Sequence, residues 1–165
     1  MNYNNYVLDA NIFIEAANRY YAFDIAPCFW NAIIEQAGNG RIFSIDRVKD
    51  ELERQDDDLA KWIKKFFYQW CDTTNQGDVI RDYANIMQWV MSNPQFFPEA
   101  KSSFAAGADG WLVAYAMARS CVVVTLEQYD RYIKRKIPIP NVCTYFRVPY
   151  IDTFAMLRKL GVKFN

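Results

Sequence analysis

Short apolar runs alternate with helical patterns along the chain, an order typical of an α/β domain. Residues 6–8 (YVL) form an apolar run that stops at Asp9, and residues 12–17 continue with helical character. A short buried strand followed at once by a helix is the start of a βα unit. A second strand is predicted over residues 41–45, and the helix predicted over residues 46–54 completes a second unit.

The middle of the chain predicts more helix, interrupted by a break and a long loop. Aromatic residues recur at helical spacing over residues 62–70 with lysines between them, which indicates an amphipathic helix. Residues 72–78 (DTTNQGD) are typical of a turn, and another helix is predicted over residues 79–91. Residues 92–107 contain two prolines, so we expect a long loop there, near a functional edge or acting as a lid.

The last third of the chain contains the most apolar strand. A helix is predicted over residues 108–118, and residues 122–125 (VVVT) have the composition of strands that parallel sheets bury between helices. A final strand is expected over residues 141–146 and a final helix over residues 152–160, closed by Gly161. Together these elements predict a three-layer α/β domain with a mainly parallel central sheet.

Composition limits the chemistry available to this domain, which we expect to span residues 1–165 as one unit. The chain has no histidine, so a Ser-His-Asp or Cys-His relay and a histidine-ligated zinc site are excluded. Its four cysteines are widely spaced, which argues against a zinc ribbon and suits buried free thiols. Any catalysis must therefore depend on carboxylates, hydroxyls, lysines, thiols or a metal ion.

Charge and hydropathy bear on partners and location. Residues 1–98 carry 9 basic and 14 acidic side chains, and residues 99–165 carry 10 basic and 5 acidic ones, so the chain is neutral overall. Bulk charge therefore does not predict binding to nucleic acid, which would need a local basic patch or a bound cation. The longest apolar run, residues 111–118, is too short for a membrane span and no signal peptide is visible, so we expect a cytoplasmic protein.

Four carboxylates stand where a parallel sheet places its binding crevice, near the carboxyl ends of the strands. Asp9 directly follows the first strand, and Glu127 lies two residues beyond Thr125 at the end of the apolar strand. Asp109 and Glu51 lie on predicted helices, each beside an apolar stripe. Clustered carboxylates repel one another and lose hydration, and a divalent cation relieves both costs. The pattern predicts a carboxylate site of the Mg²⁺ type for phosphodiester chemistry.

Each acid also has a structural interpretation. Asp9 suits a helix cap, and Asp109 suits the positive end of its helix dipole. Glu51 belongs to the acidic run 50–58, and charge runs commonly face solvent. Asp46, itself a capping candidate for the helix over 46–54 together with Ser44, is the best reserve ligand. The structural interpretations predict no relation among the four positions, whereas the metal site does.

In their order along the chain, these positions resemble the acidic motifs of PIN domains, the metal-dependent ribonucleases found as VapC-type toxins and in RNA processing. The resemblance rests on LDAN at residues 8–11, DEL at 50–52, AD at 108–109 and VTLE at 124–127. It covers nearly the whole chain. The stretch SIDRVKDEL and the tail segment IPIPNVC resemble an uncharacterised PIN-like family of bacteria and archaea.

The resemblance implies a PIN-like fold, a Mg²⁺- or Mn²⁺-dependent endoribonuclease, and the toxin of a toxin–antitoxin pair. The residues that match the family pattern are the acids Asp9, Glu51, Asp109 and Glu127 as metal ligands, with Asn11 and Thr125 as polar residues that orient them. The fourth acid is more often Asp in the wider family, so Glu127 is expected to hold the metal directly or through water. The implied partners are an RNA substrate, an antitoxin protein and a second copy of the chain.

The sequence is compatible with two other functions. A PIN-like fold without turnover would be a binding module, and metal titration would separate the two. A phosphohydrolase that forms an aspartyl phosphate on Asp9 is the other alternative, but such enzymes usually carry a second Asp where this chain has Asn11.

Two further groups have both a functional and a structural interpretation. One is aromatic and either stacks bases or, as we expect, fills the core: Tyr20, Tyr21, Phe23, Phe29 and Trp30. The other is basic and either contacts phosphate or forms a solvated helix face: Arg131, Lys134, Arg135 and Lys136.

Overall fold

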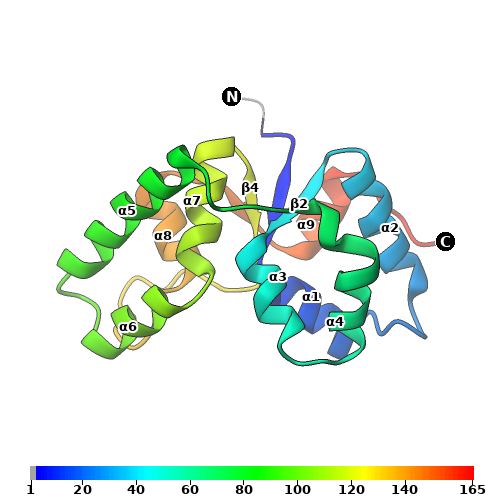
Figure 1. Cartoon of the computed structure of the whole chain (residues 1–165), viewed down its shortest axis with the longest axis horizontal. Helices are drawn as coiled ribbons and strands as arrows, with labels where there is room; N and C mark the ends of the chain where they lie inside the picture. The colour runs from blue at the N-terminus through cyan, green and yellow to red at the C-terminus, as the bar shows by residue number, and fades with distance from the viewer. Residues whose placement is uncertain (1–2) are drawn as a thin grey trace.

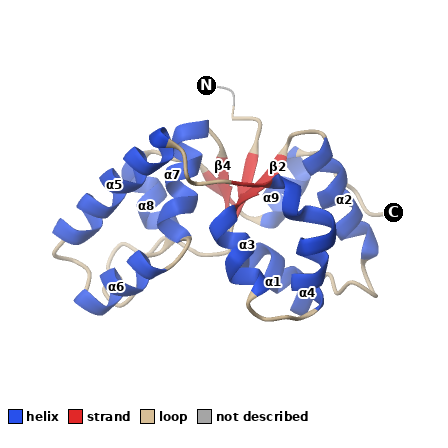
Figure 2. Ribbon diagram, viewed as in Figure 1, coloured by secondary structure: helices blue, strands red, loops and turns tan. Residues whose placement is uncertain are grey.

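A parallel sheet of five short strands forms the centre of the molecule in the computed structural model, which describes residues 3–165. The strand order is β3-β2-β1-β4-β5, and every neighbouring pair is parallel. The strands are β1 (Tyr6–Leu8), β2 (Ile42–Ile45), β3 (Cys71–Asp72), β4 (Val122–Val124) and β5 (Tyr150–Ile151). The carboxyl ends of all five therefore open on one edge of the sheet, with β1 and β4 side by side at its middle (Figure 2).

Helices cover both faces of this sheet, which gives the expected three layers (Figure 1). One group holds α1 (Ala10–Glu15), α2 (Pro27–Gly38), α3 (Asp46–Glu53), α4 (Asp58–Trp62) and α9 (Thr153–Lys159). The other group holds α5 (Gly77–Ser92), α6 (Pro98–Ala106), α7 (Asp109–Arg119) and α8 (Ile139–Phe146). The predicted α/β architecture with a parallel sheet is confirmed.

The aromatic residues near the N-terminus belong to the core, as expected. Phe29 and Trp30 are buried, the Tyr21 and Phe29 rings stack at 4.3 Å, and the Phe23 and Trp30 rings stack at 4.2 Å. Tyr20 differs from the other four because 60% of it is exposed. Tyr20 is therefore the one ring of these five that is largely exposed.

The strand predicted over residues 141–146 is wrong, because this segment is helix α8. Its buried residues Ile139, Val142 and Cys143 follow the i, i+3, i+4 spacing of a helix face. Pro140 sits in the first turn, where a helix tolerates proline because that N–H has no intrahelical partner. The last strand of the sheet is instead β5, which pairs with β4.

The long loop or lid predicted over residues 92–107 is also wrong. Helix α5 continues to Ser92, and α6 begins at Pro98 after a short link. Here too the proline occupies the first helical turn, and Ala100 and Phe104 lie four residues apart on the buried face. Pro98 and Pro140 therefore mark the starts of α6 and α8 and do not prevent these helices from forming.

Other local predictions are partly confirmed. The helix over residues 62–70 is divided into α4, a π-helical turn (Ile63–Phe67) and a 3₁₀ turn (Tyr68–Trp70). The capping of α3 by Ser44 or Asp46 is wrong, since Ile45 holds the N-cap position and the Ser44 hydroxyl donates to the Leu8 carbonyl oxygen at 2.8 Å.

Two expectations concern the cysteines and membrane-spanning helices. Cys121 and Cys143 are buried as expected, whereas Cys28 is exposed. Among residues 3–165, no helix is both long enough and apolar enough to cross a bilayer.

Candidate active site

Asp9 is a buried carboxylate at the carboxyl end of β1. The apolar strand Tyr6–Leu8 carries it into the interior, where only 3% of the residue is exposed. Asp9 holds the N-cap position of α1, but its side chain makes no capping hydrogen bond. Its Oδ2 accepts a hydrogen bond from the Thr125 hydroxyl at 3.2 Å. The side chain is therefore directed across the sheet toward β4, and the cap interpretation is wrong.

Asp109 and Glu127 approach Asp9 from the other half of the sheet. Burial raises the pKa of Asp9 to about 8, and the charges of Asp109 and Glu127 add to this rise. Burial likewise raises the pKa of Asp109 to about 7, with further contributions from Glu127 and Glu51. Desolvation and like-charge repulsion act in the same direction here. The cluster is thus short of positive charge, the condition that a divalent cation would relieve.

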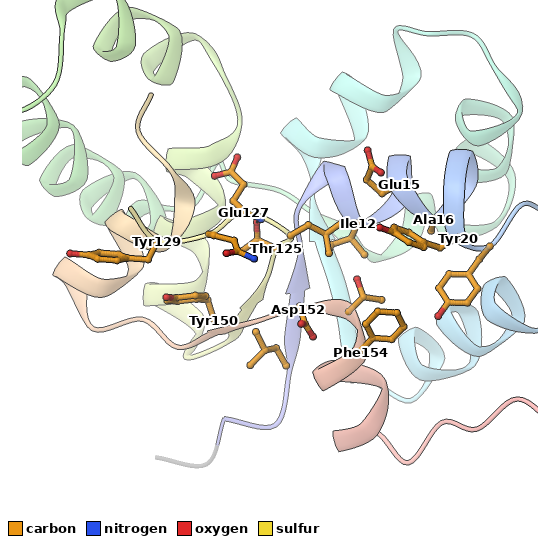
Figure 3. Close-up of a pocket in the computed structure, with 15 residues that line it drawn as sticks. Ile12, Glu15, Ala16, Tyr20, Thr125, Glu127, Tyr129, Tyr150, Asp152 and Phe154 are labelled. Atoms are coloured by element: carbon orange, nitrogen blue, oxygen red, sulfur yellow. The ribbon is translucent and has the colours of Figure 1, made fainter. Parts of the chain in front are cut away.

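Glu127 is held in place by the segment that follows it. Its Oε1 accepts from the Lys136 ammonium at 2.8 Å, and its Oε2 accepts from the Ile139 backbone N–H at 2.8 Å. The Glu127 backbone N–H donates to the Thr125 hydroxyl at 3.1 Å. The Thr125 hydroxyl thus links the Asp9 carboxylate to the Glu127 backbone. Figure 3 shows Thr125 beside Glu127.

Two predicted site residues lie at the rim of this cluster. Glu51 is exposed on α3, and its charge acts on Asp109. Asn11 is exposed in the first turn of α1. The structure therefore gathers Asp9, Asp109, Glu127 and Thr125, and it leaves Glu51 and Asn11 facing solvent.

Asp46, the reserve ligand, is committed to a structural network. Its carboxylate accepts from the Thr74 N–H at 3.0 Å, the Thr74 hydroxyl at 2.9 Å and the Thr73 hydroxyl at 3.4 Å. It also accepts from the Arg47 N–H at 2.8 Å. Asp46 thereby ties the start of α3 to the turn after β3.

The donor chemistry of the cluster fits a hard divalent cation. Carboxylate oxygens are the ligands that Mg²⁺ and Mn²⁺ prefer, and Mg²⁺ usually keeps several waters and takes only one or two carboxylates from the protein. Within the described part of the chain, no three acidic or thiol side chains converge closely enough to grip an ion together. The set suits an ion held by the buried Asp9 and the half-buried Asp109 and bridged to the other acids through water.

The basic residues form the wall beside Glu127, but not as a helix face. Residues 125–138 are a loop, so the solvated-helix interpretation is wrong. Arg135 and Lys136 line a cavity of about 320 Å³ together with Asp109. Positive charge therefore adjoins the acidic cluster on this side.

A larger cavity also adjoins the cluster (Figure 3). Its volume is about 500 Å³, and Thr125 and Glu127 form part of its wall together with Tyr150, Asp152 and Phe154. Sequence reasoning missed these last three residues because it placed the final strand too early. The signal available was that Asp152, like Asp9, directly follows a short apolar stretch.

Comparisons with known proteins support the fold. The model of one protein family, described as a domain of unknown function (DUF4411), matches residues 6–164. No curated protein matches the chain in sequence. The crystal structure of FitAcB from Neisseria gonorrhoeae is similar, with a TM-score of 0.54 and 16% identity over 88% of this chain and 96% of that chain.

A second solved structure agrees. VapBC2 from Rickettsia felis, solved bound to a DNA fragment from their promoter, gives a TM-score of 0.53 and 13% identity over 89% of this chain and 97% of that chain. At these identities the likeness concerns the fold. The fold of this chain is PIN-like, as its acidic motifs predict.

Proposed function

The chain belongs to the family described as a domain of unknown function (DUF4411), and we propose that it is an endoribonuclease that depends on Mg²⁺ or Mn²⁺. One observation carries the proposal. Two carboxylates, the buried Asp9 and the half-buried Asp109, lie near the carboxyl ends of the middle strands, and loss of hydration together with neighbouring negative charges raises the pKa of both. A protein gains no stability from such an arrangement, so it requires a functional reason.

Asp9 and Asp109 are the residues that would hold the cation. Glu127 completes the set, directly or through water, and Glu51 approaches it from the solvent side. A bound Mg²⁺ or Mn²⁺ ion supplies charge neutralisation at the scissile phosphate and lowers the pKa of water. Thr125 would fix the Asp9 carboxylate relative to the Glu127 backbone, because its hydroxyl is hydrogen-bonded to both.

The basic wall supplies the RNA contact in this proposal. Arg135 and Lys136 border the cavity that contains Asp109, so a phosphate of the RNA backbone that enters there meets two cations beside the acidic cluster. Because the chain as a whole is neutral, this local charge is what attracts the substrate. Cleavage should therefore weaken as salt concentration rises.

An antitoxin protein is the proposed regulatory partner. The resemblance to VapC-type toxins supports it, as does the fold shared with VapBC2. In such a pair, the free enzyme would be the harmful species and the partner would block RNA access to the acidic cluster.

Cleavage and metal binding, measured together, test the proposal. The purified chain is incubated with single-stranded and structured RNAs in Mn²⁺, in Mg²⁺ and in excess EDTA, and Mn²⁺ binding is measured by calorimetry. We expect cleavage in either metal, none in EDTA, and loss of both cleavage and binding in Asp109→Asn. Mn²⁺ binding without RNA cleavage would indicate a binding module, and release of phosphate from small phosphomonoesters would indicate a phosphohydrolase.

A further inference from the structure

The cavity beside Glu127 has the dimensions of a small-molecule site. It occupies about 500 Å³ between the carboxyl ends of β4 and β5 and the helices α1 and α9, as its lining residues show. Sites for small ligands commonly measure about 300–1,000 Å³. Its wall includes Thr125 and Glu127, so whatever occupies it lies next to the acidic cluster.

Aromatic side chains that are exposed to solvent line this cavity. Tyr20 is 60% exposed, Tyr129 47%, Tyr150 36% and Phe154 49%, in contrast to the buried aromatic core nearby. Aromatic rings exposed in this way offer surfaces on which a nucleobase can stack. The aromatic lining favours a flat, aromatic ligand.

The charges of the cavity exclude a phosphate and favour hydrogen-bond donors. Glu15 and Asp152 line it together with Glu127, and among its described lining residues none is Lys or Arg. In Figure 3 the Asp152 carboxylate is drawn between the rings of Tyr150 and Phe154. Asp152 Oδ1 accepts from the Ala155 N–H at 2.8 Å and Glu15 Oε2 pairs with Arg19 at 3.2 Å, so each carboxylate retains a second oxygen for a ligand.

Glu127 lines two cavities that differ in charge. One includes Arg131 and Lys136, which suit phosphates. The other is the aromatic and acidic cavity, which suits a neutral base. An RNA strand that crosses the acidic cluster can place its backbone at the basic cavity and one base in the aromatic and acidic cavity.

We propose that this cavity binds an unpaired guanine base of the RNA substrate, an inference that rests on the proposed ribonuclease function. Guanine is the RNA base whose Watson–Crick edge presents two adjacent N–H donors, and such an edge matches a carboxylate acceptor. Tyr150 and Phe154 supply the stacking surface, and Asp152 with Glu15 reads the donor edge. The cavity thus determines specificity for a guanine beside the scissile bond.

Binding of free ribonucleosides tests the inference without any cleavage step. Guanosine, adenosine, cytidine and uridine are compared by ligand-detected NMR with the full chain in EDTA. We expect guanosine to bind most tightly. Phe154→Ala should weaken its binding about tenfold through lost stacking. Asp152→Asn keeps a good helix cap but presents a donor to the base, so it should remove the preference for guanosine.

Tyr68→Ala is the matched control, because Tyr68 is 54% exposed but lies outside the cavity. It should leave guanosine binding unchanged. Equal binding of the four nucleosides, or guanosine binding that Phe154→Ala and Asp152→Asn leave intact, overturns the inference. Binding of N-acetyltryptophanamide at these residues in place of any nucleoside overturns it in favour of a peptide partner. Since nucleosides contain no scissile phosphate and EDTA removes metal, these results are independent of whether the chain cleaves RNA.

Discussion

Asp9 and Asp46 occupy equivalent places in the chain and have opposite environments. Each directly follows a central strand, β1 or β2, and each stands at the start of the next helix. Asp46 accepts hydrogen bonds from the backbone N–H groups of Arg47 and Thr74 and from the hydroxyls of Thr73 and Thr74. Asp9 accepts from the Thr125 hydroxyl and faces two further carboxylates.

This difference separates an acid whose hydrogen bonds stabilise the fold from an acid whose burial beside other carboxylates costs stability. Hydrogen bonds to a carboxylate favour its charged form, whereas burial and neighbouring negative charges oppose it. Asp46 is half-buried and accepts four hydrogen bonds, whereas the buried Asp9 accepts one side-chain hydrogen bond, from Thr125. The position of an acid after a strand therefore identifies it as a candidate metal ligand. The number of hydrogen-bond donors around it then distinguishes a structural acid such as Asp46 from a candidate such as Asp9.

The largest expected effect comes from exchanging each of these acids for its amide. Asp9→Asn should reduce RNA cleavage at least about 100-fold, since loss of residues that merely support metal ligands already costs about 10–100-fold. The same change should raise the melting temperature, because it removes a buried charge from a repulsive cluster. Cleavage assays and thermal denaturation check both expectations.

Asp46→Asn serves as the matched comparison. It should lower stability by about 1–3 kcal/mol, because an amide NH₂ group would face the donors that Asp46 now satisfies. Cleavage at a temperature where the variant is folded should remain. If Asp46→Asn abolishes Mn²⁺ binding while Asp9→Asn retains it, the comparison between the two acids is reversed.

The next effect concerns whether Glu127 contacts the metal. Both Glu127 oxygens already accept hydrogen bonds, from Lys136 and Ile139, which favours a contact through water. Glu127→Gln should then retain measurable cleavage, reduced about 10–100-fold, whereas Asp109→Asn should eliminate it. Parallel assays at saturating Mn²⁺ decide the point. Equal, complete loss in both variants would contradict contact through water, and wild-type activity in Glu127→Gln would remove this residue from the site.

Stability should depend on pH in a direction set by the raised pKa values. Between the ordinary carboxyl pKa of 3.8 and about 8, native Asp9 keeps a proton that the unfolded chain has released. The free energy of unfolding should therefore fall as pH rises through this window when metal is chelated. Thermal denaturation from pH 5 to pH 8 in EDTA measures it, and we expect a drop of roughly 5 °C or more.

Two additions sharpen the pH experiment. Asp9→Asn should flatten the profile. Mn²⁺ should restore stability chiefly at the alkaline end, because the ionised carboxylates are the form that binds it. A profile that rises with pH in EDTA would show that the acidic cluster is not repulsive.

The smallest expected effect comes from Lys136. Its ammonium pairs with Glu127 and also interacts with the charge of Asp109, so it competes with a cation for the same carboxylates. Lys136→Met should tighten Mn²⁺ binding about threefold, in keeping with the modest strength of a partly exposed ion pair. Lys134→Met, a change of an exposed lysine in the same loop, is the control for calorimetry. Weaker Mn²⁺ binding in Lys136→Met alone would contradict the competition.

The sequence predicts the parts of this molecule that local patterns specify. β1, β2 and β4 are short apolar runs bounded by polar residues, and Asp9 and Thr125 end two of them, so their meeting follows from a parallel sheet. The strand prediction for residues 141–146 failed because, over so short a length, their apolar residues fit either a strand or a helix. In the fold this segment is a helix that packs against α7.

The sequence predicted which acids the structure brings together, but not the environment of each one. The order of the acids pointed to Asp9, Asp109 and Glu127, yet nothing local distinguishes the exposed Glu51 from the partly buried Asp109. Several donors to Asp46 come from residues 73 and 74, which are too far away in the sequence for a helical or strand pattern to reveal the contact. Long-range hydrogen bonds of this kind require the fold.

The hydrogen bond between Thr125 and Asp9 joins positions 116 apart in the chain. During synthesis, α1, α2 and α3 emerge long before β4, so a growing chain holds Asp9 without its companions. Contacts between distant positions form late, since the intervening chain must first be ordered. If this protein cleaves RNA, the order of its contacts therefore protects its own translation. The ribosome has made most of the chain before the acidic cluster can form.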